Sequence, residues 1–305
     1  PVHVTIEPTN ICNAKCPVCE TGKGEMNRPR GMLDVGAFKK FVDDNWPNVN
    51  TNFFYFRGDP VLHNNDYEMI RYASNTGIFV ETCTNGDFMD PHGTIYSDIN
   101  VVNIQISGMD NVTPGTYRVG SDFDKVKRNL ELLVEERQRH PGSNVDITLG
   151  FIVMKQNEHQ IESFQRWGKE LGADKVQVIA PCVRTVEEGK IFLPENRQYW
   201  IYDEPAFQAG KLRPLSSSNN GCPWIWNTIA INWNGDAVAC CRDPLGTNVL
   251  GNVFAEGLTR VFNSEKAQAF RNAVLTRRNA LSICRLCPGE GVPELKPTSF
   301  PKVEA

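Results

Sequence analysis

Three cysteines near the start of the chain lie within one run of eight residues, Cys12-Asn-Ala-Lys-Cys16-Pro-Val-Cys19. The run follows a short apolar segment, which predicts that it forms the loop after a first strand. Thiolates are soft ligands that favour zinc or iron-sulfur clusters. Closed iron-sulfur sites use four cysteines, so a loop with three can leave one iron open for a substrate. The alternative is a zinc ion completed by a distant residue such as Cys83 or His63.

A second group of cysteines lies in the last third of the chain. Cys222 and Cys240 flank a predicted hairpin, and Cys284 and Cys287 form a Cys-x2-Cys pair. Four thiolates suit a structural zinc site as well as a cluster. Cys241 adjoins Cys240, and neighbours on a strand point to opposite faces. We therefore expect only Cys240 of this pair to be a ligand.

The elements that must position the first group follow a regular pattern. Apolar runs alternate with helical spacing up to about residue 180, which is typical of βα units and a parallel sheet. Helices are predicted after the capping residues Asp34, Asp66 and Asp122, and another ends at Gly172. Six strands are predicted, at 2–6, 53–56, 78–83, 101–107, 145–154 and 175–180. Such strands form an open sheet or a partial barrel, with the ligand at their carboxyl ends.

The pattern changes after Cys182. We expect a barrel domain at 1–190, a linker with some helix at 191–220, and a small second domain at 221–305. In the second domain the Asn234-Gly235 turn predicts a hairpin. A helix is predicted at 265–275.

The three-cysteine loop after a first strand, in a six-fold βα pattern, resembles the radical S-adenosylmethionine (radical SAM) superfamily. The resemblance implies an α/β fold with a partial (β/α)6 TIM-like barrel. It also implies a 4Fe-4S cluster on Cys12, Cys16 and Cys19 whose open iron binds S-adenosylmethionine. One electron, from a donor such as flavodoxin or ferredoxin, then yields a 5′-deoxyadenosyl radical that abstracts a substrate hydrogen.

Further motifs carry this resemblance at the ends of successive strands. Arg57-Gly58-Asp59-Pro60 is similar to the family's Gly-Gly-Glu-Pro motif, with departures at Arg57 and Asp59. Arg118 resembles the arginine that pairs with the methionine carboxylate, for which a guanidinium is apt. The cofactor-binding residues that the resemblance implies are Gly58, Asp59, Thr84, Asn85, Ser107 and Arg118.

The second cysteine group is similar to the family's auxiliary-cluster domain, called SPASM, in its shortened form, called twitch. This resemblance implies one auxiliary 4Fe-4S cluster held by Cys222, Cys240, Cys284 and Cys287. A fully ligated cluster has no open iron, so it serves as an electron relay or as a scaffold.

The resemblance predicts a radical SAM oxidoreductase, a dehydrogenase acting on a small polyol, aminocyclitol or sugar-derived metabolite. The alternatives are an epimerase or decarboxylase of a nucleotide-linked sugar, a peptide-modifying maturase, or a non-catalytic metal-binding scaffold. Cys182 ends the sixth predicted strand, where a thiol could donate a hydrogen atom as an epimerase requires. The alternative is that Cys182 only packs in the core as a small hydrophobic side chain.

Composition limits the partners. The formal net charge is -4, so the whole chain offers no basic field for a nucleic acid or an anionic membrane. No apolar run approaches the roughly 20 residues that a membrane-spanning helix needs, and the first residues do not resemble a secretory signal. We therefore predict a cytoplasmic protein whose partners are a small-molecule substrate and an electron donor.

Overall fold

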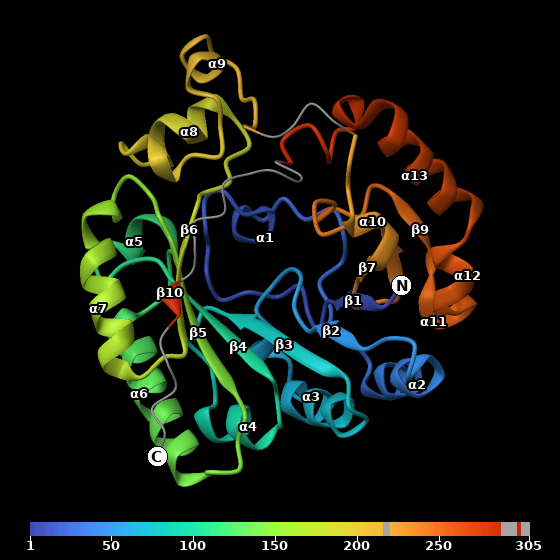
Figure 1. Cartoon of the computed structure of the whole chain (residues 1–305), viewed down its shortest axis with the longest axis horizontal. Coiled ribbons are helices and arrows are strands. Elements are labelled where there is room, and N and C mark those ends of the chain that lie inside the picture. The colour runs from blue at the N-terminus through green and yellow to red at the C-terminus, as the bar shows by residue number, and fades with distance from the viewer. Residues whose placement is uncertain (216–219, 288–297, 300–305) are drawn as a thin grey trace.

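The computed structural model describes residues 1–215, 220–287 and 298–299, and it is built around one curved sheet (Figure 1). The strands are β1 (His3–Ile6), β2 (Thr51–Phe53), β3 (Phe79–Thr84), β4 (Val101–Ile106), β5 (Asp146–Ile152), β6 (Lys175–Ile179), β7 (Thr228–Ile231), β8 (Asp236–Val238), β9 (Val249–Asn252) and β10 (Thr298–Ser299). Their order is β10-β6-β5-β4-β3-β2-β1-β7-β8-β9. Strands β1 to β6 are parallel to one another and follow chain order, and β10 is antiparallel to β6. The predicted α/β class with a six-stranded partial barrel is confirmed.

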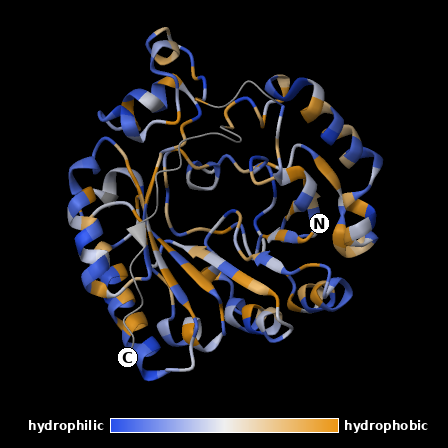
Figure 2. Ribbon diagram, in the orientation of Figure 1, coloured by the Kyte–Doolittle hydropathy of each residue, from blue (hydrophilic) through white to orange (hydrophobic). Residues whose placement is uncertain are grey.

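Helices cover the outer face of these six strands (Figure 1). The helices are α1 (Glu20–Lys23), α2 (Val35–Asn45), α3 (Asp66–Asn75), α4 (Pro91–Tyr96), α5 (Pro114–Tyr117), α6 (Phe123–Arg139), α7 (Ile161–Leu171), α8 (Val186–Phe192), α9 (Glu204–Gln208), α10 (Trp224–Asn227), α11 (Val253–Glu256), α12 (Leu258–Phe262) and α13 (Glu265–Arg277). Figure 2 shows that apolar and polar residues alternate along the long helices. The core of the molecule fills the space between, with Phe38, Leu130 and Phe164 fully buried.

The predicted helix starts are largely confirmed. Asp34 accepts a hydrogen bond from Ala37 N at 2.7 Å, and Asp122 accepts one from Lys125 N at 3.1 Å. The prediction was wrong at α3, where the N-cap is Asn65 and Asp66 is the first helical residue. It was also wrong at β2, which spans Thr51–Phe53 and ends where 53–56 was expected to begin a strand.

The second half of the chain joins the same sheet. Strand β7 pairs parallel with β1, from His3 opposite Thr228 to Ile6 opposite Ile231. The predicted hairpin is present, because β7 and β8 are antiparallel and Gly235 N donates to Asn232 O in the turn. Helix α13 matches the helix predicted at 265–275. The C-terminal part is therefore an extension of the barrel sheet at the β1 edge.

A buried ion pair ties β1 to this hairpin. Glu7 is fully buried, and its two oxygens accept from Arg28 Nη1 and Nη2 at 2.8 and 2.7 Å. Its Oε2 also accepts from Trp233 N at 3.2 Å, in the hairpin turn. Bidentate arginine-carboxylate pairs of this kind are strong and directional. The pair fixes the start of the chain against a turn more than two hundred residues later.

The stretch expected as a linker, 191–220, is described at 191–215 and 220, and its residues between 192 and 212 pack against the barrel, whereas Asn220 Nδ2 donates to Leu275 O of α13 at 2.7 Å. Phe192, Trp200, Tyr202 and Phe207 are buried together with Met154, which follows β5. Helices α8 and α9 belong to this layer, which lies beyond the end of β6 (Figure 1).

None of the helices in the described ranges is both long and apolar enough to cross a membrane.

Candidate functional site

The three-cysteine loop lies at the carboxyl end of β1 and runs into α1. Cys19 N donates to Cys16 O at 3.2 Å, and Lys15 N donates to Val119 O at 2.8 Å, which ties the loop to the segment after β4. All three cysteines are partly exposed. Burial raises the pKa of Cys12 to about 12, and the charges of Cys16 and Cys19 add to that effect. The loop thus gathers three thiols near one another.

The donor set fits an iron-sulfur cluster. Thiolates are the ligands of such clusters, and each binds its own iron. Within the described residues, no three His, Cys, Asp or Glu side chains are packed around the position of a single metal ion. His63, the residue considered for a zinc site, uses both ring nitrogens, on Leu33 O at 2.8 Å and Asn65 N at 3.0 Å.

Gly58 lets the β2 loop pass directly beneath the cysteine loop. Its φ is 74°, and a Cβ there would lie 2.5 Å from the carbonyl oxygens of both Thr9 and Ile11. Asp59 N donates to Ile11 O at 2.8 Å, so the backbone holds the same contact. Only glycine satisfies both the positive φ and the close approach.

Asp59 is buried and engages its neighbours on β3. Its two oxygens accept from Thr84 Oγ1 at 2.8 Å and Asn85 N at 2.9 Å. Burial raises the pKa of Asp59, although these hydrogen bonds oppose the effect. The carboxylate is therefore a positioning group for Thr84 and Asn85, and its direct contact with a cofactor stays a prediction.

Asn85 connects the end of β3 to the cysteine loop. Its Nδ2 donates to Asn13 Oδ1 at 2.8 Å, and Asn13 Nδ2 donates to Asp87 Oδ2 at 2.9 Å. Asn13 directly follows Cys12, so this chain of amides orients the first cysteine.

Arg118 and Ser107 leave buried polar atoms without partners among the described residues. Arg118 is 8% exposed and donates from Nη1 to Gln105 O at 2.8 Å, but its Nε is unpaired. Ser107 Oγ is also buried and unpaired. Both residues line a small cavity of about 10 Å³ that Asn85 also lines. Unpaired buried donors are costly, but a cavity of this size has room for only about one water molecule, so the pairing of Arg118 with a carboxylate stays a prediction.

The four auxiliary cysteines gather beside α10 and α13. Cys284 is buried and packs with Cys222 in one small apolar cluster. Burial raises the pKa of Cys240, and the charges of Cys241, Cys284 and Cys287 raise it further. The arrangement brings together thiols from the hairpin, from the segment before α10 and from the last described loop.

Cys240 and Cys241 lie beyond β8, which ends at Val238, so strand alternation does not apply to them, and the choice of Cys240 as the ligand stays a prediction. Cys241 is exposed, and besides Cys287 it lies near Arg57 of the barrel, because that charge acts on its thiol. Arg242, the next residue, directs both terminal nitrogens at the sulfur of Cys182, 3.7 Å away. The hairpin thus reaches the end of β6.

A polar cavity in the barrel interior was missed by the sequence analysis. Its volume is about 350 Å³, and its lining includes Tyr55, Glu81, Asn103, Gln105, Lys175 and Gln177. Glu81 accepts from Tyr55 Oη at 3.2 Å and Asn103 Nδ2 at 2.8 Å. Burial raises the pKa of Glu81, while these hydrogen bonds and Lys175 oppose the shift. Polar residues at every second position of β3, β4 and β6 were the available signal.

Glu20, the first residue of α1, was also missed. It lies between Arg57 Nη1 at 3.2 Å and Arg184 Nε at 3.1 Å. Burial alone would raise the pKa of Glu20, but the two arginines hold it below its usual range. The residue after Cys19 is thereby fixed to loops at both sides of the barrel.

Comparison with known proteins agrees with this geometry. The family model of the radical SAM superfamily matches residues 6–168, and the model of SPASM, an iron-sulfur cluster-binding domain, matches residues 222–288. The chain is 23% identical to the tungsten-containing aldehyde ferredoxin oxidoreductase cofactor-modifying protein of Pyrococcus furiosus, covering 93% of this chain and 86% of that protein.

Two further proteins are similar over nearly the whole chain. The antilisterial bacteriocin subtilosin biosynthesis protein AlbA of Bacillus subtilis is 22% identical over 95% of this chain, which spans 66% of that protein's length. The crystal structure of BtrN in complex with AdoMet and 2-DOIA superposes with a TM-score of 0.60 at 14% identity, covering 97% of this chain and 96% of BtrN. At that identity the likeness concerns the fold.

Proposed function

The chain belongs to the radical SAM superfamily, and on that basis we propose that it oxidises a small, hydroxyl-bearing substrate by radical dehydrogenation. The family implies one 4Fe-4S cluster with S-adenosylmethionine, and the SPASM domain implies an auxiliary iron-sulfur cluster. The observation that carries the proposal is the polar cavity inside the barrel. A polyol, an aminocyclitol or a sugar-derived metabolite can bind such a lining through many hydrogen bonds.

When bound, these groups would supply a 5′-deoxyadenosyl radical for hydrogen abstraction and an acceptor for the second electron of an oxidation. Cys12, Cys16 and Cys19 hold the first cluster in our proposal. Arg118 pairs with the methionine carboxylate. The remaining proposed cofactor-binding residues are Gly58, Asp59, Thr84, Asn85 and Ser107.

Glu81 is the group that we propose as the proton acceptor. Loss of a hydrogen atom from a carbinol carbon must be followed by loss of the hydroxyl proton if a ketone is to form. A carboxylate whose pKa is raised by burial is better matched to that task near neutral pH than an exposed one. Tyr55 and Asn103 hold Glu81 in one orientation by hydrogen bonds.

Cys222, Cys240, Cys284 and Cys287 are the proposed ligands of the auxiliary cluster, with relay or scaffold as its role. The proposed external donor is a flavodoxin or ferredoxin. The seven cysteines proposed as cluster ligands must stay reduced to bind iron, which favours a reducing compartment such as the cytoplasm.

A peptide maturase is the second candidate. Its support is the 22% identity to the subtilosin biosynthesis protein over 95% of this chain. The polar interior cavity supports the small-molecule candidate, because its volume of about 350 Å³ suits one polar ring.

The proposal is tested with anaerobically reconstituted protein, S-adenosylmethionine and dithionite. We expect 5′-deoxyadenosine, and with a panel of polyols and aminocyclitols we expect one product lighter by two hydrogens. The E81Q variant should keep basal cleavage of S-adenosylmethionine and lose product by about tenfold or more. Cleavage without any oxidised product from the panel, but with a modified peptide, would favour the maturase; no cleavage at all would overturn both.

A further inference from the structure

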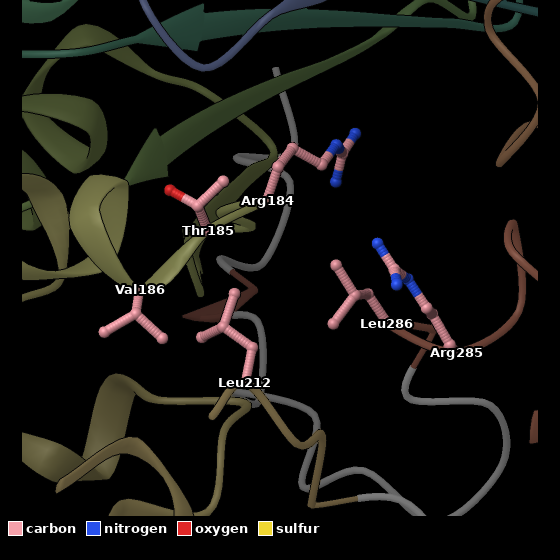
Figure 3. A pocket seen from close by; sticks show the side chains of 6 residues that line it. All are labelled: Arg184, Thr185, Val186, Leu212, Arg285 and Leu286. Atoms are coloured by element: carbon pink, nitrogen blue, oxygen red, sulfur yellow. The ribbon is translucent and has the colours of Figure 1, made fainter. Parts of the chain in front are cut away.

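A second cavity lies between α8 and the last described cysteine loop. Its volume is about 260 Å³, and its lining comprises Arg184, Thr185, Val186, Leu212, Arg285 and Leu286. Figure 3 shows the two arginine side chains extending from opposite walls toward the same open space. Val186, Leu212 and Leu286 form an apolar side of this space.

Positive charge exceeds negative charge around this cavity. Glu188 accepts from Arg184 N at 2.6 Å, but its other oxygen lies 3.4 Å from Lys23 Nζ. Arg184 uses Nε on Glu20, at 3.1 Å, and Glu20 is shared with Arg57. Arg285 is exposed; its backbone N donates to Leu281 O at 3.0 Å, but its guanidinium makes no hydrogen bond or ion pair with any part of the chain that the structure describes. One carboxylate therefore serves two arginines, while Arg285 stays available.

We propose that this cavity binds an anionic group, a carboxylate or a phosphate, of the substrate. Guanidinium groups bind such oxyanions through two parallel N–H bonds, and two converging arginines can hold one group from both sides. The apolar side chains accept the carbon atoms next to it. This inference rests on the proposed function, since it specifies the substrate's chemistry.

The cavity lies between the two cysteine groups. Arg184 forms an ion pair with Glu20, the residue after Cys19, and Arg285 lies between Cys284 and Cys287 in the sequence. An anionic group held here anchors one end of a substrate at the mouth of the barrel. The hydroxyl-bearing end then extends toward the interior cavity.

The test is calorimetric titration of the oxidised, cluster-loaded protein with inorganic pyrophosphate and, separately, with glutarate. Both titrations contain saturating S-adenosylmethionine, so that Arg118 and the open iron are occupied, and no reductant, so that no turnover occurs. We expect one of the two anions to bind, and the one that binds identifies phosphate or carboxylate as the ligand. The R285Q variant should weaken its binding about tenfold or more.

R285K keeps the charge without the planar fork and should fall between wild type and R285Q. R166Q, on an exposed arginine of α7, is the matched control and should bind as wild type does. Iron content and the visible spectrum are measured on every variant, because Arg285 adjoins proposed cluster ligands. Absence of binding at about 10 mM of either anion, or equal binding by R285Q, overturns the inference. Basal cleavage of S-adenosylmethionine by the same preparations reports separately on the proposed function.

Discussion

Both terminal nitrogens of Arg242 lie 3.7 Å from the sulfur of Cys182. The contact joins the hairpin of the auxiliary region to the end of β6. In this arrangement the sulfur accepts hydrogen bonds from the hairpin on its lone pairs. The contact gives Cys182 a structural role, and hydrogen-atom donation by its S–H stays a separate prediction.

We therefore expect the C182A variant to keep most of its oxidised product, within about threefold of wild type. C182S, which retains an acceptor for Arg242, should be closer still to wild type. The measurement is product formed per 5′-deoxyadenosine at equal iron content. A C182A protein that still cleaves S-adenosylmethionine with substrate yet forms no product would instead assign hydrogen donation to this thiol.

Gly58 supplies a second prediction. The G58A variant places a Cβ 2.5 Å from two backbone carbonyls, and alanine at positive φ costs roughly 1 to 2 kcal/mol before any clash. We expect a lower melting temperature and poor cluster loading, measured by calorimetry and by iron content. G210A is the matched control, because Gly210 has the same φ of 74° with nothing within 4 Å of the added Cβ. If G58A and G210A lost melting temperature and iron content equally, the close approach of Gly58 to the cysteine loop would contribute nothing to stability or cluster loading.

The cysteine assignments predict iron content. Wild-type protein should bind about eight irons, and C12A/C16A/C19A about four, with no 5′-deoxyadenosine formed. Replacing Cys222, Cys240, Cys284 and Cys287 together should also leave about four, with basal cleavage retained. C241A is the control for C240A, and it should load as wild type does because Cys241 is exposed and lies near Arg57. Iron loss in C241A but not in C240A would exchange the two assignments.

Asp66 predicts a dependence of stability on pH. Burial raises its pKa to about 7, and the charges of Asp59 and Asp90 add to the shift. The folded state therefore holds a proton that the unfolded state loses above about pH 4, so stability falls as the pH rises from about 4 to about 7 and is then constant. The D66N variant has no carboxyl group to titrate here. Relative to wild type, its free energy of unfolding should therefore rise by up to roughly 4 kcal/mol as the pH goes from about 4 to about 7.

The measurement for Asp66 is the melting temperature of both proteins between pH 5 and pH 8. E170Q, on an exposed glutamate of α7, is the control and should follow the wild-type curve. Parallel curves for D66N and wild type would mean that Asp66 ionises normally in the folded protein.

Local patterns were sufficient for much of the fold. The apolar period located five of the six parallel strands and overlapped the other, β2, only at Phe53, and Asn234-Gly235 located the hairpin, because both signals reside in adjacent residues. The strand β2 was misjudged because the aromatic run 53–56 imitates a strand, whereas pairing with β1 ends at Phe53. Local propensity does not record where a neighbouring strand stops.

Long-range contacts could not be read in the same way. The pairing of β1 with β7 joins residues more than two hundred positions apart, and no local sequence pattern in either strand predicts which strand it pairs with. The sequence does not indicate that Arg242 lies beside Cys182 or that Arg285 lines a cavity with Arg184, because the fold brings these residues together. Side-chain type predicts what chemistry a residue can do, but the chain's path decides which other groups share that space.

The position of β1 between β2 and β7 sets an order of events during synthesis. One edge of β1 is covered as soon as β2 emerges, but the other waits for Thr228–Ile231. At about 5 to 20 residues per second, the time between synthesis of β1 and synthesis of β7 is roughly 10 to 45 seconds. During it, the strand that leads into Cys12 keeps an unpaired edge, which is a site of wrong association. The strand that supports the three-cysteine loop is therefore completed only after a segment more than two hundred residues later has been made.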